Sequence, residues 1–242
     1  MLKKINTNFG TLYATDEPEL IAKYLREKEA VLYICEDLEH APFMDGVRYI
    51  TDSYGLDDGK YLDMVCARQK HLPLTILETE RTIIREITVE DLPELYELYD
   101  DDEIKKFLEP LYEYEEEKVF TEKYIDEVYG IYGYGLWVVF DKNDGILIGR
   151  AGIGIRNIDG KDENELGYII KKEYRNKGYC TEICTAIIEY AWSELGFEHL
   201  YIVTEPLNVN SVRVAERLGF VLYKKAESEK KEYHIYKRTR EK

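Results

Sequence analysis

The stretch EYRNKGYCTE, residues 173–182, joins an apolar run to a long helical pattern and carries cations, a glycine and small or polar residues. The first amides of any helix lack intrahelical partners, and a glycine beside them lets a ligand approach the backbone. The amides of residues 176–181, at the positive end of this helix, therefore predict an anion site, with phosphate as the expected anion. Arg175 and Lys177 add positive charge. The alternative is that Gly178 only turns a strand into a helix.

Strand and helix patterns lead up to this junction from residue 81. RTIIREI (81–87) alternates as a strand does, and Thr88 with Asp91 three residues later predicts a capped helix start. Residues 90–129 are mostly helical in pattern, with a break near Pro110.

The remaining elements follow from the same kinds of pattern. We expect strands at 135–141, 146–156, 165–170 and 199–205, helices at 182–197 and 210–220, and a closing antiparallel pair at 220–225 and 232–238. The turn KNDG joins the first two of these strands into a hairpin, and glycines end both helices. The order from residue 81 is then β-α-α-β-β-β-α-β-α-β-β.

The first part of the chain predicts a separate small α/β domain over residues 1–79. It has helical patterns at 15–29 and 60–71, and strand patterns at 30–35, 47–51 and 72–77. We find no catalytic motif in it and expect a scaffold or a dimerisation domain, with the role and a homodimer left open. Residues 80–242 form the second domain.

Composition limits the classes of partner. The chain has 242 residues, 49 acidic against 33 basic, and a net charge of −16, which argues against binding nucleic-acid phosphates or anionic lipid and makes a cationic substrate plausible. Apolar runs are far shorter than the roughly 20 residues that span a bilayer, and MLKKINTNFG lacks the apolar core of a signal peptide. We therefore expect a cytoplasmic protein without a membrane partner.

The cysteines favour reduced, structural thiols. Cys35, Cys66, Cys180 and Cys184 form no CxxC pair, and the four histidines are scattered, so spacing predicts no metal site.

Four local patterns in this order resemble the GNAT superfamily of N-acetyltransferases over roughly residues 80–240. Residues 175–180 match the family's R/Q-x-x-G-x-G/A segment, NELGYII its E-x-G-Y strand, and NVNSVRVAERLGF its N-x-x-S segment with Asn208 and Ser211 in the matching positions. TERTIIREITVEDLPELYELYDD is similar to the opening strand and acidic helix of the ribosomal-protein and polyamine branches. The resemblance implies an α/β (α+β) fold with a mixed, mostly antiparallel sheet flanked by helices.

The resemblance also implies acetyl-CoA as co-substrate, with its pyrophosphate on the junction. The residues carried over for this contact are Arg175, Asn176, Lys177, Gly178, Tyr179, Cys180 and Thr181, and Asn208 and Ser211 complete the cofactor site. Cys180 departs from the usual glycine or alanine, but a thiol is only slightly larger than a methyl group. A backbone amide at Ile169 or Ile170, where the family separates two strands, is expected to meet the oxyanion.

Acyl transfer to an amine needs a base, because an alkylamine with a pKa near 10 is mostly protonated. Glu165 is the candidate, directly or through a water; its alternative is a solvated carboxylate or a structural salt bridge. The leaving thiolate needs a hydrogen-bond donor, for which the resemblance suggests Ser211. Here the alternatives are an N-cap role, shared with Asn208 and Asn210, and a tyrosine as donor.

The resulting hypothesis is an acetyl-CoA-dependent N-acetyltransferase acting on a small-molecule or peptide amine. A non-catalytic acyl-CoA sensor is the alternative, and a nucleotide-dependent protein is poorly supported because the phosphate motif G-x-x-x-x-G-K-[ST] is missing. The acidic runs at 99–103 and 113–118, which the resemblance places on the acceptor side opposite the cofactor, could attract a polyamine, an aminoglycoside or a basic protein N-terminus. The alternative is that they are solvated helix faces.

Overall fold

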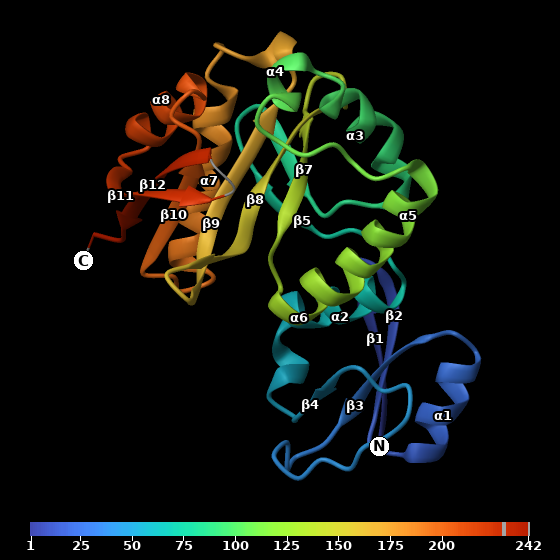
Figure 1. Cartoon of the computed structure of the whole chain (residues 1–242). Helices are drawn as coiled ribbons and strands as arrows, with labels where there is room; N and C mark the ends of the chain where they lie inside the picture. Colours follow the sequence, from blue (N-terminus) through green and yellow to red (C-terminus); the bar gives the residue numbers. More distant parts are fainter. Residues whose placement is uncertain (229–230, 242) are drawn as a thin grey trace. The chain divides into compact units, whose positions relative to one another are not determined.

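The computed structural model describes residues 1–228 and 231–241, which divide into two compact units, Met1–Leu74 and Thr75–Lys242. Each unit has its own sheet (Figure 1). Among the helices that the structure describes, none is long and apolar enough to cross a membrane.

The first unit is a four-stranded sheet in the order β1-β2-β3-β4 with two helices. Its strands are β1 (Leu2–Thr7), β2 (Gly10–Thr15), β3 (Ala30–Ile34) and β4 (Ile50–Thr51), and its helices are α1 (Pro18–Arg26) and α2 (Gly59–Gln69), preceded by the short turn η1 (Gly55–Asp57). β1 and β2 are antiparallel, whereas β2, β3 and β4 run parallel. All five residues of β3 are buried, which explains its continuous apolar run.

The sequence predicted both helices and β3 of this unit but missed the hairpin of β1 and β2. β1 is an edge strand with mostly exposed side chains, so it shows no apolar run. The strand expected at 72–77 also differs: it lies at 75–78 and pairs with β6 in the sheet of the second unit.

The second unit is an eight-stranded sheet in the order β11-β12-β10-β9-β8-β7-β6-β5. Its strands are β5 (Thr75–Glu78), β6 (Thr82–Arg85), β7 (Leu136–Asp141), β8 (Leu147–Ile158), β9 (Lys161–Ile170), β10 (His199–Thr204), β11 (Val221–Ser228) and β12 (Lys231–Thr239). Its α-helices are α3 (Leu92–Tyr99), α4 (Asp102–Lys105), α5 (Tyr114–Lys123), α6 (Gly130–Tyr132), α7 (Tyr179–Ser193) and α8 (Val209–Arg217). It also has the short 3-10 helices η2 (Val89–Asp91) and η4 (Lys172–Tyr174) and the π-helix η3 (Tyr124–Tyr129). The order of elements predicted from residue 81 is confirmed, as is the mixed, mostly antiparallel sheet.

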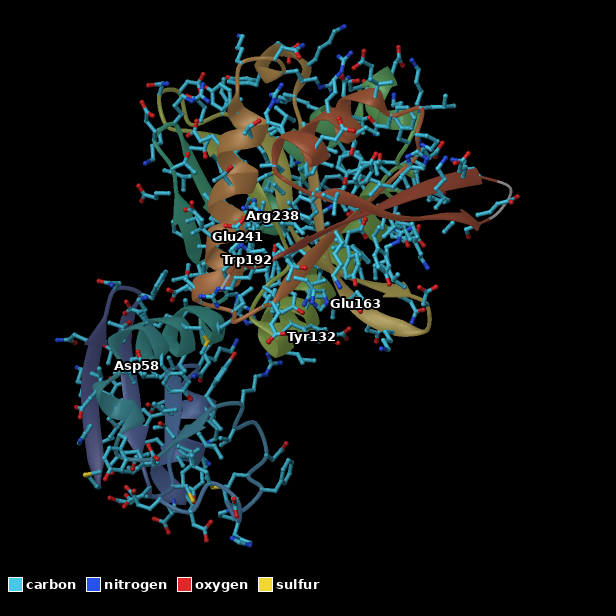
Figure 2. All side chains as sticks on the ribbon, turned by 90° about the vertical axis from the view of Figure 1, so that its left-hand side faces the viewer. Asp58, Tyr132, Glu163, Trp192, Arg238 and Glu241 are labelled. Carbon is cyan, nitrogen blue, oxygen red and sulfur yellow. The ribbon has the colours of Figure 1, made fainter. Side chains whose placement is uncertain are left out.

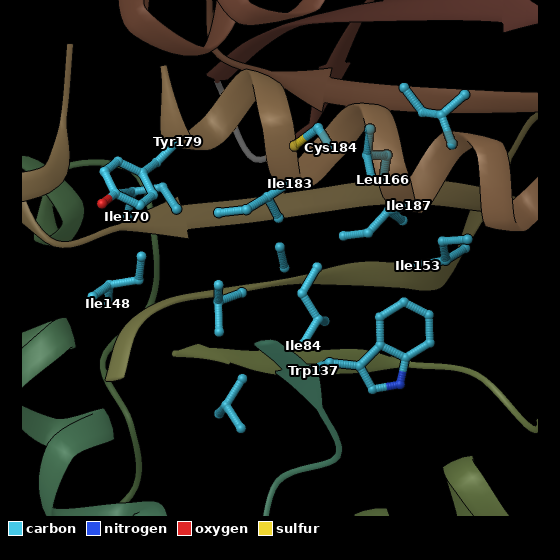
Figure 3. Close-up of a cluster of buried hydrophobic side chains, with 14 of the residues drawn as sticks. Ile84, Trp137, Ile148, Ile153, Leu166, Ile170, Tyr179, Ile183, Cys184 and Ile187 are labelled. Carbon is cyan, nitrogen blue, oxygen red and sulfur yellow. The ribbon is translucent and has the colours of Figure 1, made fainter. Parts of the chain in front are cut away.

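Helices cover both faces of this sheet: α7 and α8 lie on one side, and α3 and α5 on the other (Figure 1). Ile183 and Ile187 of α7 point toward Leu166 and Ile153 of the sheet, with Trp137 beneath them (Figure 3). All of these side chains are at most 1% exposed, so the core fixes α7, and therefore the junction before it, against β8 and β9.

The expected capping box is present at the start of the first helix of this unit. The Thr88 side chain accepts a hydrogen bond from the Asp91 amide, and the Asp91 side chain accepts one from the Thr88 amide. Arg85 adds a two-pronged ion pair to Asp91, with both contacts at 2.6–2.7 Å.

The sheet splits between β9 and β10. The parallel pairing of these two strands, both wholly described, is confined to Tyr201 opposite Glu165. β8 continues to pair with β9 as far as Ile170, opposite Gly149. From Leu166 onward β9 therefore has one paired edge and one open edge.

Candidate active site

Residues 175–181 join the loop after β9 to the first turn of α7, and we name this segment the diphosphate loop after the ligand that the sequence predicts for it. Asn176 and Gly178 both adopt left-handed backbone conformations, with φ of 61° and 84°. Gly178 is the N-cap of α7, and no side chain of the described residues makes a capping hydrogen bond there. The amides at the start of α7 are consequently open to an anion, as the sequence predicted.

Arg81, the residue directly before β6, supports the diphosphate loop. Its Nη1 donates to the carbonyl of Lys177 at 3.0 Å and its Nε to Glu182 at 2.6 Å, and its guanidinium lies 4.0 Å from the centre of the Tyr179 ring. A Cβ on Gly178 would come within 3.4 Å of Arg81 Nη2. The loop is thus held in shape by a residue 96 positions away in sequence.

Tyr179 is anchored inward rather than toward a ligand. Its hydroxyl donates to the buried carboxylate of Asp141 at 2.6 Å, and this bond, with the Asn143 amide, lowers the pKa of Asp141. Tyr179 can therefore serve a cofactor through its backbone amide, not its side chain. The other loop side chains are nearer to solvent: Lys177 lies 5.9 Å from the Tyr174 ring, and Thr181 accepts a long bond from Arg217 at 3.5 Å.

Arg175 is engaged within the protein. Its Nε donates to the carbonyl of Ile170 at 2.9 Å, and its two terminal nitrogens lie 3.0 Å from Asp101 and Glu103. Burial alone would raise the pKa of Asp101, but the Glu103 amide and Arg175 hold it below its ordinary value. The positive charge that the sequence predicted Arg175 to add at the junction is thus paired with two carboxylates.

The same contacts correct the expected place of the first acidic run, 99–103. Asp101 and Glu103 bind the diphosphate loop through Arg175 instead of lying opposite it, and Asp101 also caps α4 by accepting from the Glu103 and Ile104 amides. Asp100 pairs with Lys105. In the second run, Glu117 is buried and accepts from the Tyr112 amide, so these carboxylates are partly structural.

Glu165 lies on β9 where the sheet begins to split, between Gly154 of β8 and Tyr201 of β10. Its side chain is 20% exposed, and Arg156 Nη1 donates to its Oε2 at a long 3.4 Å. Burial raises the pKa of Glu165, although Arg156 and the Val203 amide act in the opposite direction. A half-exposed arginine at this distance makes a weak pair, so the carboxylate remains able to accept a proton.

Gly154 leaves free space beside this carboxylate. A Cβ there would meet nothing within 4 Å, whereas a Cβ on Gly152, two residues earlier, would lie 2.0 Å from the carbonyl of Gly135. Packing thus requires a glycine at 152 but not at 154. The missing side chain at 154 leaves open space on the face of the sheet that carries Glu165.

A second carboxylate precedes Glu165 on the same face of β9, because alternate residues of a strand share a face. Glu163, labelled in Figure 2, lies near the turn between β8 and β9, opposite Arg156. Its Oε2 is 2.9 Å from Nε2 of His199 on β10. Glu163 is thus paired with His199, and Glu165, two residues further along β9, is the carboxylate nearer the split.

Ser211 and Asn208 lie at the start of α8. Asn208 is the N-cap, and its Oδ1 accepts from the Ser211 amide at 3.2 Å, which confirms the capping alternative for Asn208. The Ser211 hydroxyl is 3.2 Å from the Tyr168 hydroxyl, which also lies 3.2 Å from the Ser211 carbonyl. Burial raises the pKa of Tyr168, so its hydroxyl stays protonated as a donor. The sequence did not single out Tyr168.

The split exposes particular amides of β9. Lys171 donates its amide to Ile148 of β8 at 2.7 Å, and amides alternate between the two edges of a strand. Ile169 therefore also points its amide toward β8, whereas the amides of Tyr168 and Ile170 point into the split. Of the two amides expected for an oxyanion, the one on Ile170 therefore points into the split.

Comparison with known proteins gives a consistent result. A family model described as an acetyltransferase (GNAT) domain matches residues 81–221. The protein YkkB of Bacillus subtilis is 31% identical over 107 residues, which cover 44% of this chain and 62% of YkkB. The uncharacterized N-acetyltransferase YnaD of the same organism is 28% identical over 144 residues, covering 59% of this chain and 81% of YnaD.

Solved structures show the same fold. The ribosomal-protein-S5-alanine acetyltransferase of Vibrio fischeri has a TM-score of 0.58 at 19% identity, covering 67% of this chain and 95% of that one. The microcin C7 self immunity acetyltransferase MccE, solved in complex with acetyl-CoA and AMP, has a TM-score of 0.56 at 19% identity, covering 66% and 93%.

Proposed function

Because the chain belongs to the GNAT acetyltransferase family, we propose that it transfers the acetyl group of acetyl-CoA to a primary amine with Glu165 as the base. The observation that carries this proposal is the position of Glu165. It is a mostly buried carboxylate of raised pKa at the start of an open strand edge, with free space beside it at Gly154. A base whose pKa is closer to that of the amine accepts its proton less unfavourably.

Each group of the site has a separate task in this reaction. The backbone amides of residues 176–181 bind the diphosphate, and the Ile170 amide donates to the oxyanion as the amine nitrogen bonds to the carbonyl carbon. Glu165 accepts the proton that the amine loses. As the carbon–sulfur bond breaks, we assign the hydrogen-bond donor for the thiolate to the hydroxyl pair of Ser211 and Tyr168.

The acceptor is proposed only as a small-molecule or peptide primary amine. The pairing of Asp101 and Glu103 with Arg175 removes part of the argument for a polycation. For Met1–Leu74 we keep the proposal of a scaffold or dimerisation unit, with a cytoplasmic location for the chain as a whole. The four free cysteines fit a reducing compartment.

Acetyl-CoA binding tests the cofactor site. At a hundredfold excess over Kd, a ligand of the folded state adds about 2.7 kcal/mol of stability, which raises Tm by about 5–10 °C. Gly178→Glu places negative charge at the start of α7 and should abolish this shift. Gly160→Glu is the matched control, because Gly160 also has a positive φ of 78° but lies in the open turn between β8 and β9.

A Gly178→Glu protein that stays folded and responds like the parent would place the cofactor elsewhere. Turnover is then measured as CoA release with a panel of amines. Binding of acetyl-CoA without turnover of any amine would favour the sensor alternative.

A further inference from the structure

Two free thiols lie at the start of α7, and one of them, Cys180, is within the diphosphate loop. Cys180 and Cys184 are one helical turn apart on α7, and their sulfur atoms are 4.0 Å apart. Cys180 is partly exposed, whereas Cys184 is fully buried. The other two cysteines belong to the first unit, Cys35 directly after β3 and Cys66 in α2.

We propose that Cys180 and Cys184 form a reversible disulfide that disables the diphosphate loop, which makes acetyl-CoA binding sensitive to oxidants. The effect on binding rests on the function proposed above; formation of the disulfide does not. The geometry of the helix makes the two states exclusive.

A disulfide cannot form on an intact helical turn. It requires Cβ atoms about 3.5–4.5 Å apart, while residues four apart on a helix have Cβ atoms about 5–6 Å apart. The first turn of α7 must therefore deform by about 1–2 Å to bring the sulfur atoms from 4.0 Å into bonding distance. The Cys180 and Thr181 amides of that turn belong to the diphosphate site, so deformation displaces them.

The oxidation balances with a hydroperoxide as the oxidant. The Cys180 sulfur takes one oxygen from the O–O bond, giving a sulfenic acid and water or an alcohol. The Cys184 thiol then attacks that sulfur, the S–S bond forms, and the hydroxyl leaves as water with the thiol proton. The two electrons that the thiols lose reduce the peroxide bond, and a dithiol reductant reverses the step.

The exposures of the two thiols determine which one reacts with the oxidant first. Cys180 is the thiol that an oxidant can reach. Burial raises the pKa of Cys184 well above its ordinary value, so this thiol stays protonated and shielded from oxidants until the turn opens. Bound acetyl-CoA holds the turn helical and should slow the reaction.

The experiment uses the full chain carrying Cys35→Ser and Cys66→Ala, so that the remaining thiols are the pair on α7. After treatment with hydrogen peroxide, peptide mass spectrometry should show residues 180 and 184 linked, with two hydrogens lost. Calorimetry should show acetyl-CoA affinity reduced about tenfold or more, equivalent to about 1.4 kcal/mol, and dithiothreitol should restore it. Cys184→Ala added to this background cannot form the disulfide. After the same peroxide treatment, its acetyl-CoA affinity should fall little, and dithiothreitol should therefore restore little.

Two results would overturn the proposal: oxidation of Cys180 to sulfinic acid without a link to Cys184, or a linked protein that binds acetyl-CoA as the reduced form does. Saturating acetyl-CoA should also slow formation of the link in the parent, and an unchanged rate would count against exclusive states. A reduced protein that does not bind acetyl-CoA would instead refute the proposed function. Formation of the disulfide would still be tested separately by peptide mass spectrometry.

Discussion

The substitution Glu165→Gln separates proton transfer from binding. Glutamine has the shape of glutamate and retains an oxygen that can accept the bond from Arg156 at 3.4 Å, but it cannot accept a proton from the amine. Acetyl-CoA should bind with nearly its original Kd, because the diphosphate loop makes no contact with this side chain in the described structure. The catalytic rate alone should fall.

The size of the loss follows from the exposure of Glu165. A positioned base contributes roughly 10²- to 10⁴-fold, or about 2.7–5.4 kcal/mol. The Glu165 side chain is 20% exposed, so water can reach the site and replace part of its action. We therefore expect a fall in kcat of about a hundredfold, at the lower end of that range.

The assay is CoA release as a function of pH, with Kd for acetyl-CoA measured by calorimetry. On the acid side, kcat/KM of the parent falls with protonation of both the amine and Glu165, and the variant should retain only the dependence on the amine. Burial raises the folded-state pKa of Glu165, so its carboxylate lowers stability as the pH rises through that pKa. Glu165→Gln should consequently raise Tm at neutral pH and have little effect below the unfolded pKa.

An unchanged acid limb with a near-parental rate would remove Glu165 from the mechanism. A lower Tm at neutral pH would instead assign it to a structural salt bridge with Arg156.

Substitutions at four further positions test the surroundings of the site. Arg156→Gln removes a charge that lowers the pKa of Glu165, so the acid limb of the pH–rate profile should move to higher pH, while Arg156→Lys should leave it near its original place. Arg81→Met removes the bonds that hold the diphosphate loop, and calorimetry should show weaker acetyl-CoA binding with a small change in kcat at saturation. Gly152→Ala should lower the free energy of unfolding by about 1–3 kcal/mol in denaturant titrations, because its Cβ would overlap the Gly135 carbonyl. Gly154→Ala should leave that free energy unchanged and lower kcat/KM more for bulky amines than for small ones.

Most elements of the second unit could be predicted because their signals are local. The capping pair Thr88 and Asp91 lies within one turn, and the hairpin of β7 and β8 follows from a short turn between two apolar runs. Ile183 and Ile187 repeat at helical spacing and are fully buried as that spacing predicts. In each case the interacting residues are near one another in sequence.

The contacts that the sequence did not predict join distant residues. Arg175 binds Glu103 across 72 positions, and Tyr168 binds Ser211 across 43. An acidic run shows the same composition whether it faces solvent or pairs with an arginine. The strand β1 lacks the alternating apolar residues that predict a half-buried strand. The buried residues of this hairpin belong to its partner β2.

Under the proposed function, the open edge of β9 assigns main-chain groups to the acetyl donor and side-chain groups to the acceptor. An unpaired strand edge accepts an extended chain that carries its own amides, as an added strand would. Main-chain amides such as those of Tyr168 and Ile170 remain as donors when the side chain at their position is substituted, proline excepted. In the reaction proposed above, substitutions around Gly154 therefore alter the choice of acceptor while the backbone donors for the acetyl donor are kept, which leaves acceptor specificity free to diverge between related genes.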